Sequence, residues 1–503
     1  MRKSILYLLG LIFFLASACN LPVRSLPSVL DQTKTPEPVI FETQEQKKPP
    51  LIHQTPIAQP VPTATRYLKY DPARYVAYPV QSGETLNGVA AHFSVAPAEI
   101  LSSRPLPPQG LLAVNQTLVI PKLTEQAPFP QKLLPDAEIV NSPCGRSFNI
   151  PEYVNAARGL LSTYTQEVDS RLMSGAEIIK LVSENASVNP HFLLAFIEFR
   201  SHWVTGSPPK PNLTYPLGFN IPNNEGLYLE LSISANLLNI GYYAWREGKM
   251  TELTFLDYRS ARISPDLNPG TVALQYLFAR MFGQSDWENA LYGPNGFLST
   301  YQNLFGDPLA CARTVEPLFP DGMQIPTLEL PFAPGEAWAL TGGLHNDWIT
   351  GTPPGALDFA PITGEPPCTV SRAWALAPAA GIVTRSENGI LQLTLVDDTG
   401  KTTGWDLLFM HIAKKDRISA GVRVMTNDPI GHPSCEGGIA TGTHVHIARM
   451  YHGEWIGAGD PFPYILSGWL ALPGERPYQS TLIKGDRVVE SNIVGTSNAM
   501  IIR

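Results

Sequence analysis

Two histidines stand one residue apart near the C-terminal end, in the stretch T-G-T-H-V-H-I-A at residues 441–448. Val445 and Ile447 alternate with His444 and His446, and such alternation predicts a β-strand. Side chains two residues apart on a strand point to the same face, so both imidazoles leave the backbone together. The chain has only ten histidines in 503 residues, and this pair indicates a ligand that takes nitrogen donors.

A catalytic zinc ion commonly takes three protein ligands from histidine and carboxylate groups and leaves a fourth position for water. The candidate ligands are His345 in T-G-G-L-H-N-D-W, Asp358 in G-A-L-D-F-A-P, and one histidine of the 444/446 pair. Asp358 shares its expected strand face with two alanines, which leave room for a ligand. Asp347 is a rival carboxylate, although it falls in a loop without strand context.

Five motifs follow one another between about residues 335 and 460: G-G-L-H, G-A-L-D-F-A-P, A-G-I-V, M-H-I and T-G-T-H-V-H-I. In this order they resemble the lysostaphin/LytM-type zinc endopeptidases, which cut peptidoglycan cross-links. The resemblance implies that His345, Asp358 and His446 bind Zn²⁺. It also implies that His411 and His444 are active-site histidines that do not bind the metal. One would accept the proton of water and the other would donate to the oxyanion, and the assignment between them stays open.

The sequence departs from this family at two places. Most members space the first histidine and the aspartate four apart, whereas twelve residues separate His345 from Asp358 here. A subgroup related to beta-lytic proteases is similar in carrying a longer insertion. The run G-H-P-S-C-E-G-G-I-A-T-G-T replaces the usual Gly/Ser-rich run before the histidine pair, which bears on substrate preference. A structural zinc with four protein ligands is disfavoured because Cys368 and Cys435 lack a C-x-x-C context.

Residues 75–122 form a separate unit with V-Q-S-G-E-T-L near its start and L-V-I-P at its end. Apolar spacing predicts a strand, a helix from about residue 84, a second helix at 97–103 and a closing strand, in the order βααβ. This unit resembles a LysM module, which binds N-acetylglucosamine-containing glycans. The resemblance implies that Gly83, Glu84 and Thr85 lie in the loop that contributes to the sugar groove. A βααβ spacer without a ligand is the alternative.

Residues 140–315 show apolar side chains three and four apart throughout, which predicts a central all-α domain. The stretch V-N-P-H-F-L-L-A-F-I-E-F-R-S resembles a helix of lysozyme-like lytic transglycosylases, in which a catalytic glutamate precedes a serine. Arg200 stands at the glutamate's position, and a guanidinium cannot protonate a glycosidic oxygen. Glu198 is turned about 200° around the helix from that position. We therefore expect a degenerate, lysozyme-like spacer or a glycan-binding relic.

The N-terminus carries a signal. Two basic residues precede an apolar run to Ala18 and then Cys19, which predicts a signal peptide over 1–19. The ending L-A-S-A-C resembles a bacterial lipobox, which implies that Cys19 is lipidated and anchors the protein to a membrane. Ordinary secretion with cleavage near Ala18 is the alternative. Residues 20–70 are rich in proline and threonine and predict a disordered tether.

The number of cysteines is consistent with export of the protein to an oxidising compartment. Apart from Cys19, the chain has Cys144, Cys311, Cys368 and Cys435, and four cysteines in an oxidising compartment can pair. Of the three connectivities, 144 with 311 and 368 with 435 is the simplest, and free thiols are the alternative. The net charge of −8 gives no sign of nucleic-acid binding.

These expectations combine into a multidomain α+β protein. A LysM module is followed by the helical domain, an antiparallel β metallopeptidase domain at 325–470 and a C-terminal tail at 471–503. The function they favour is a zinc endopeptidase acting on peptidoglycan in the cell envelope. It would lie on the outer side of the cytoplasmic membrane, or in the periplasm or outer membrane of a diderm host. The alternative is a catalytically silent peptidoglycan-binding regulator that activates other cell-wall hydrolases.

Overall fold

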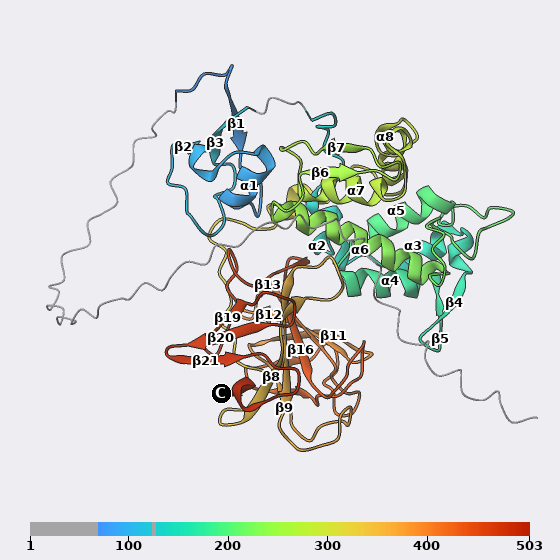
Figure 1. The fold of residues 1–503 in the computed structure, drawn as a ribbon. Coiled ribbons are helices and arrows are strands. Elements are labelled where there is room, and N and C mark those ends of the chain that lie inside the picture. The colour runs from blue at the N-terminus through green and yellow to red at the C-terminus, as the bar shows by residue number, and fades with distance from the viewer. Residues whose placement is uncertain (1–68, 123–126) are drawn as a thin grey trace, which may run out of the picture. The chain divides into compact units, whose positions relative to one another are not determined.

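The computed structural model describes residues 69–122 and 127–503 (Figure 1). The predicted signal peptide, the lipidation site at Cys19 and nearly all of the predicted tether lie outside the described residues. Among the described residues, none of the helices is both long enough and apolar enough to cross a membrane.

Residues 75–121 fold around a three-stranded antiparallel sheet of order β1-β3-β2. Its elements are β1 (Tyr75–Pro79), α1 (Leu86–Phe93), a 3-10 turn (Pro97–Glu99), β2 (Leu101–Ser102) and β3 (Thr117–Pro121). The second predicted helix is wrong beyond that single turn, because Leu101 and Ser102 pair with β3 instead. The unit has a hydrophobic core of its own, which includes Tyr78, Val89 and Leu118.

The central domain holds the helices of the described residues between 143 and 315, and it is not purely helical as the sequence predicts. Its helices are α2 (Pro143–Arg146), α3 (Ile150–Ala157), α4 (Gly175–Ala186), α5 (Pro190–Ser201), α6 (Leu227–Arg246), α7 (Pro269–Ala279), α8 (Gln284–Tyr292), α9 (Phe297–Phe305) and α10 (Leu309–Val315). Two short hairpins interrupt them: β4 (Thr165–Val168) with β5 (Arg171–Ser174), and β6 (Glu252–Thr254) with β7 (Ser260–Arg262). Helical periodicity does not reveal such short strands.

Helix α5 is the central helix of this domain. Its residues from Phe192 to Ile197 are apolar on every side and all fully buried. A helix that is apolar all round requires cover on all faces, and α4 and α9 are among its neighbours. Asn189 caps its first turn by accepting the His191 N–H.

The C-terminal part is built on a large antiparallel sheet of order β14-β11-β12-β13-β16-β9-β8-β22. Its strands are β8 (Ala337–Asn346), β9 (Pro354–Pro361), β11 (Gly381–Glu387), β12 (Ile390–Val396), β13 (Thr402–Met410), β14 (Arg423–Val424), β16 (Val445–Tyr451) and β22 (Met500–Ile502), with β17 (Glu454–Trp455) paired to β16. A smaller pair joins β10 (Ala375–Leu376) and β15 (Pro429–Gly431). The predicted antiparallel β architecture is therefore present.

The segment 471–503, expected to be a tail, is instead part of this fold. A second sheet of order β18-β19-β20-β21 contains β18 (Ile465–Leu466), β19 (Trp469–Pro473), β20 (Ser480–Lys484) and β21 (Arg487–Glu490). Strand β22 then pairs with β8, with Ile501 opposite Trp338. Ile501 and Trp338 are both buried, so this pairing adds to the core and closes one edge of the large sheet.

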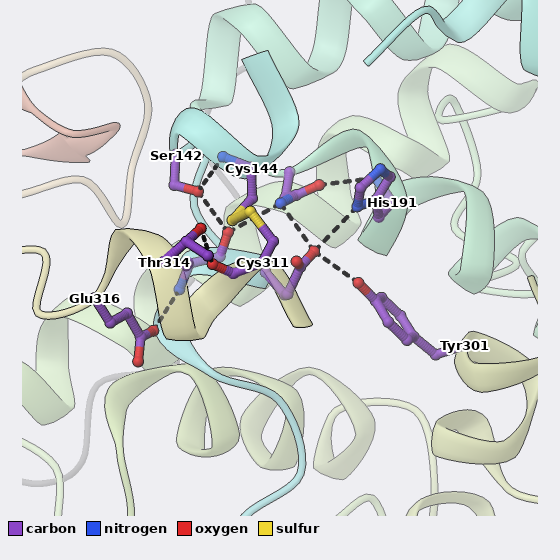
Figure 2. Close-up of a disulfide and its surroundings, with 10 residues drawn as sticks. Ser142, Cys144, His191, Tyr301, Cys311, Thr314 and Glu316 are labelled. Carbon is purple, nitrogen blue, oxygen red and sulfur yellow. Dashed lines mark hydrogen bonds and ion pairs between the residues drawn. A yellow bond between two sulfur atoms is a disulfide. The ribbon is translucent and has the colours of Figure 1, made fainter. Parts of the chain in front are cut away.

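The structure pairs Cys144 with Cys311 and Cys368 with Cys435, the simplest connectivity expected from the sequence. The first disulfide joins α2 to α10 (Figure 2). The buried Glu138 lies close to both cysteines and contacts His191 and Tyr301. It closes a segment of 167 residues. Both ends of the helical domain are thereby held together.

Removing this first disulfide will destabilise the protein. Replacing Cys144 and Cys311 together by serine releases the constraint on the unfolded chain, and we expect the free energy of unfolding to fall by about 2–5 kcal/mol. The urea midpoint in non-reducing buffer measures the change. The comparison is the variant in which Cys368 and Cys435 are both replaced by serine. The disulfide lost in that variant closes a segment of only 67 residues. An unchanged midpoint after loss of the first disulfide would contradict the expectation.

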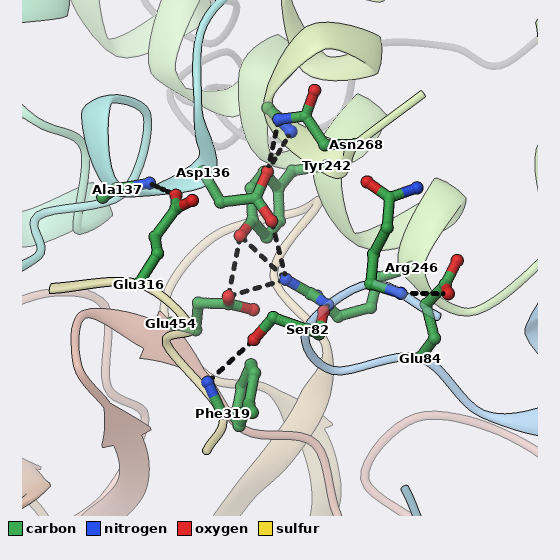
Figure 3. A network of polar contacts seen from close by, with 12 residues as sticks. Ser82, Glu84, Asp136, Ala137, Tyr242, Arg246, Asn268, Glu316, Phe319 and Glu454 are labelled. Carbon is green, nitrogen blue, oxygen red and sulfur yellow. Dashed lines mark hydrogen bonds and ion pairs between the residues drawn. The ribbon is translucent and has the colours of Figure 1, made fainter. Parts of the chain in front are cut away.

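One buried arginine joins three parts of the chain (Figure 3). Arg246 of α6 donates to the Ser82 carbonyl at 2.8 Å and to Glu454 Oε1 of β17 at 2.7 Å. Its guanidinium also lies 3.4 Å from Asp136 and donates to the Tyr242 hydroxyl. The 75–121 unit, the helical domain and the β domain therefore meet at one cation.

Substituting Glu454 by glutamine will change the thermal stability of the protein by an amount that depends on pH. Burial raises the pKa of Glu454 from 4.5 to about 7, and Arg246 only partly opposes this. Because the pKa is higher in the folded state, the wild type loses stability as pH rises from 4.5 to 7, and glutamine removes that loss. We expect the Tm of E454Q minus that of the wild type to increase over this range and then level off. A difference in Tm that is flat with pH would contradict the assignment.

Candidate metal centre

Three neighbouring strands of the large sheet bring the predicted metal ligands together. His446 on β16 stands directly opposite Asp358 on β9. On the other side of β9, His345 near the end of β8 pairs with Ala356. Residues two apart on a strand share a face, so Asp358 and Ala356 point the same way and His345 joins them.

The donor atoms of these three residues converge. His345 Nε2 lies 3.0 Å from His446 Nδ1. Asp358 Oδ1 lies 3.2 Å from His446 Nδ1 and 3.5 Å from His345 Nε2. One donor atom of each residue lies within 4.8 Å of the others, and all three side chains are buried. Separations of this size suit ligands that share one ion.

The ring nitrogens of His345 and His446 that point away from the cluster are hydrogen-bonded, and these bonds determine the tautomer of each imidazole. His345 Nδ1 lies 2.7 Å from the Gly343 carbonyl, and His446 Nε2 lies 2.8 Å from the Asp347 carbonyl. A carbonyl only accepts, so each of these nitrogens carries the hydrogen and the other ring nitrogen presents a lone pair. Two lone pairs and a carboxylate oxygen thus face one another, and Asp358 Oδ1 has no hydrogen-bond partner among the described residues. A cation satisfies all three, so the residues fit zinc.

The ionisation of Asp358 agrees with a ligand role. Burial alone would raise its pKa, but the surrounding imidazoles of His446, His345 and His444 outweigh burial and lower the pKa to about 2. The carboxyl group is therefore charged throughout the physiological range. Burial also lowers the pKa of His345, which keeps this imidazole neutral and able to bind a metal.

The two glycines of the G-G-L-H motif make room for this centre. A side chain at Gly342 would place its first carbon 2.2 Å from Asp358 Oδ2. At Gly343 it would meet the backbone of residues 479–480, 2.4 Å from the Ser480 nitrogen. Only glycine lets Asp358 and the 479–480 segment approach β8 this closely.

The insertion between His345 and Asp358 supports the centre through its backbone. Asp347 is fully buried, but its carboxylate is not among the converging donors; its carbonyl holds His446 instead. Burial raises the pKa of Asp347 well above the ordinary value. Gly351 of the same loop lies against α6, where a side chain would meet Ile240 and the Asn236 carbonyl. The helical domain thus supports the loop that orients a ligand.

His411 and His444 lie beside the cluster without joining it. Their ring centroids are 4.4 Å apart, and His444 Nε2 lies 3.8 Å from Asp358 Oδ1. His411 Nδ1 donates to the Glu436 carbonyl and His444 Nδ1 to the Gly442 carbonyl, so both Nε2 atoms are free to accept a proton. Burial, with a smaller contribution from His444, lowers the pKa of His411 to about 3, which favours its neutral form.

The backbone at His411 is held in an uncommon conformation. Its φ of +64° lies in the left-handed region, which residues other than glycine rarely adopt. The Ser434 N–H and hydroxyl both donate to the His411 carbonyl, at 2.7 and 3.0 Å. These bonds keep the imidazole beside His444, at some cost in backbone strain.

Tyr478 is a residue of this site that the sequence analysis does not single out. Its ring stacks on His345, with centroids 4.2 Å apart and an interplanar angle of 16°. The ring is 57% exposed, so it covers one side of a metal ligand while facing solvent. It belongs to the segment taken for a tail, and G-E-R-P-Y-Q-S contains no pattern that points to a site.

The second disulfide joins two loops near the histidine pair. Cys368 and Cys435 link the segment after β9 to the segment before β16. Thr443, next to His444, also donates its hydroxyl to the Thr369 carbonyl at 2.9 Å. These links restrain the loop that carries His444.

The helical domain packs on the same sheet face as the metal ligands. Asp406 on β13 lies four residues from Met410, which is paired with His446, so Asp406 and His446 share a face. Arg146 binds Asp406 at 2.6 Å. Arg385, on the same face, donates to Asn185 of α4 at 2.8 Å. The helical domain therefore covers part of this face.

The residues assigned to sugar binding lie in a buried region. Glu84 is only 8% exposed, and it accepts hydrogen bonds from the Tyr78 hydroxyl and the Gln81 N–H. A side chain at Gly83 would collide with Arg246 and Phe319. Thr85 caps α1 by accepting the Gly88 N–H at 3.1 Å.

The glutamates of the helical domain have structural partners. Glu198, near the position of the lysozyme-like motif, accepts the N–H groups of Val204 and Thr205 and the Thr205 hydroxyl. Glu230 accepts four backbone N–H groups of residues 217–220. Arg200 donates to the Leu217 carbonyl. These carboxylates therefore hold neighbouring loops.

The described residues thus combine a large antiparallel sheet with a histidine–aspartate–histidine cluster that could hold a metal ion. A family model described as "LasA, N-terminal domain" matches residues 132–317. The chain is 24% identical over 306 residues to "Protease LasA" of Pseudomonas aeruginosa, covering 57% of this chain and 68% of the relative. The chain is therefore similar to a protease, and its residues 132–317 are similar to the N-terminal domain of that protease.

Solved structures similar to this chain include two peptidases. The M23 metalloprotease pseudoalterin from the deep sea has a TM-score of 0.28 and 21% identity, covering 33% of this chain and 95% of that one. The catalytic domain of lysostaphin from Staphylococcus simulans has a TM-score of 0.17 and 20% identity, covering 25% of this chain and 88% of that one.

Proposed function

We propose that this protein is a zinc-dependent endopeptidase that hydrolyses peptide cross-links of peptidoglycan, anchored at the cell envelope by a lipid on Cys19. One observation supports the enzymatic part of the proposal. The lone pairs of two imidazoles and a carboxylate oxygen of Asp358 all point toward the same small space. Such an arrangement is unfavourable without a cation. LasA and lysostaphin, to which the chain is similar, are a protease and an antimicrobial peptidase.

The residues around the centre have separate tasks in this proposal. His345, Asp358 and His446 would hold the zinc, which supplies Lewis acidity towards a carbonyl and brings the pKa of water towards about 7. Of His411 and His444, one accepts the proton of the attacking water at Nε2 and the other hydrogen-bonds the oxygen that becomes negative. The proton is then passed to the leaving nitrogen, so that an amide and water become a carboxylate and an ammonium group. The carbonyls of Glu436 and Gly442 accept the Nδ1 hydrogens of both rings, so a neutral ring can accept a proton at Nε2. The ring that hydrogen-bonds the oxyanion does so as an imidazolium with a hydrogen on Nε2.

The silent-regulator alternative is not favoured. All three ligand positions are filled, and both non-ligand histidines present free Nε2 atoms. A protein that only binds would have no use for two proton-accepting imidazoles beside the ligands.

Incubation of the full chain with purified sacculi tests the proposal. We expect new amine termini in the peptide stems, identified by mass, when zinc is present and none when it has been removed by a chelator. Their absence while zinc is stoichiometrically bound would overturn the enzymatic part and favour the regulator. Cleavage of the glycan strand instead of the peptide stems would show that the enzyme cuts a glycosidic bond and would contradict the proposed endopeptidase activity.

A further inference from the structure

The loop at residues 81–85 is closed off by the rest of the protein. Arg246 donates to the Ser82 carbonyl at 2.8 Å, and the Phe319 N–H donates to the Ser82 hydroxyl at 2.9 Å (Figure 3). The Gln81 side chain donates to the carbonyls of Asp266 and Leu267. Polar groups of Gln81 and Ser82 are therefore used in contacts with the helical domain and the following linker.

The neighbouring surface of the unit is covered as well. The His92 ring lies flat on Trp245, with centroids 3.6 Å apart and an interplanar angle of 5°. The space between the two parts is about 10 Å³, which is room for about one water molecule. A sugar ring cannot enter it.

Three further contacts hold the unit from outside its loop. Arg262 donates to the His92 carbonyl and the Ser94 hydroxyl. Asp321 accepts the Val114 N–H at 3.0 Å, and Asp460 accepts the Gly110 N–H at 2.5 Å. These three side chains belong to the helical domain, the linker and the β domain, so the unit is held by all of them.

We propose that these contacts form a latch: the 75–121 unit is docked in a position that excludes glycan, and it binds N-acetylglucosamine oligomers only after its 81–85 loop leaves Arg246. This inference rests on the glycan-binding resemblance stated for that unit. Docking and glycan binding then compete for the same backbone groups. The apparent affinity for glycan is lowered by the fraction of molecules that are undocked.

The latch also connects glycan to the catalytic part. The guanidinium that holds Ser82 is the one that binds Glu454 of β17, next to β16, and β16 carries His446. Glycan binding therefore removes one of the contacts that join the helical domain to the other parts. The contacts between the helical domain and the other parts would therefore be weaker when peptidoglycan is bound.

The test compares the full chain with a variant that carries R262A, D321A and D460A, all outside the 75–121 unit. Asp398→Ala, at an exposed position on the turn between β12 and β13, is the matched control. Binding of an N-acetylglucosamine tetramer is measured by calorimetry, and amide hydrogen exchange is measured for residues 81–85. We expect the triple variant to bind the tetramer about tenfold more tightly and to exchange the loop amides faster, with the control unchanged.

Three results would overturn the latch. Equal affinity for the tetramer, despite faster exchange in the triple variant, means that docking does not compete with glycan, while glycan binding itself stands. Unchanged exchange in the triple variant means that these contacts do not hold the unit. No binding by either protein, with faster exchange in the variant, means that the glycan-binding part of the proposed function is wrong, and the latch falls with it.

Discussion

Replacing His446 by alanine will remove zinc from the protein and abolish hydrolysis of peptidoglycan. His446 supplies one of three converging donors, and its Nδ1 is the atom closest to both His345 Nε2 and Asp358 Oδ1. Without it, two ligands remain for an ion that needs at least three from the protein. We expect the wild type to hold about one zinc per chain and the variant to hold almost none.

Metal analysis of the purified protein and muropeptide release from sacculi measure this prediction. His452→Ala is a matched control, because His452 lies on the turn between β16 and β17 and is not among the converging donors. It should keep both zinc and activity. Full zinc content in H446A would show that another residue, such as Asp347, completes the centre.

Replacing His411 by asparagine will leave zinc in place but slow hydrolysis by about 10²–10⁴-fold. His411 stands beside His444 with a free Nε2, and it is not one of the converging donors. Asparagine is chosen because it tolerates the left-handed backbone that His411 adopts. The variant should therefore lose one of the two active-site imidazoles without losing the fold.

Zinc binding and turnover are measured separately, so a role of His411 as a metal ligand can be distinguished from a role in the reaction. Zinc content and the rise in Tm on adding zinc should equal those of the wild type, while turnover falls. Loss of zinc together with turnover would make His411 a ligand. Retained turnover would leave proton transfer to His444 alone.

That the candidate ligands on β9 and β16 share one face could be predicted from the sequence, because both stand in alternating patterns, whereas the choice among the candidates came from the family resemblance. Alternation around His444 and His446 and around Asp358 predicts strands, and the structure places His446 opposite Asp358 on neighbouring strands. A strand has a period of two, so the face of each side chain follows from its position alone. The two disulfides likewise have the simplest of the connectivities.

The residues that support the ligands could not be predicted in the same way. Tyr478 and the strands after residue 471 reach the site through pairing with distant segments, and G-E-R-P-Y-Q-S has no local pattern. Asp347 was considered only for its carboxylate, whereas its carbonyl orients His446. A carbonyl is present at every residue, so its role depends on three-dimensional position.

The order of the motifs, the alternation along the strands and the helical spacing between residues 140 and 315 were enough to predict the main parts of the chain and the side chains that meet at the centre. These features depend on local geometry, which repeats every two residues in a strand and every 3.6 in a helix. Only the tertiary structure decided that Gly83, Glu84 and Thr85 lie against α6 and the linker, and that the last 33 residues complete the β fold. Both outcomes depend on contacts between residues far apart in the chain, and no local period of the sequence records such contacts.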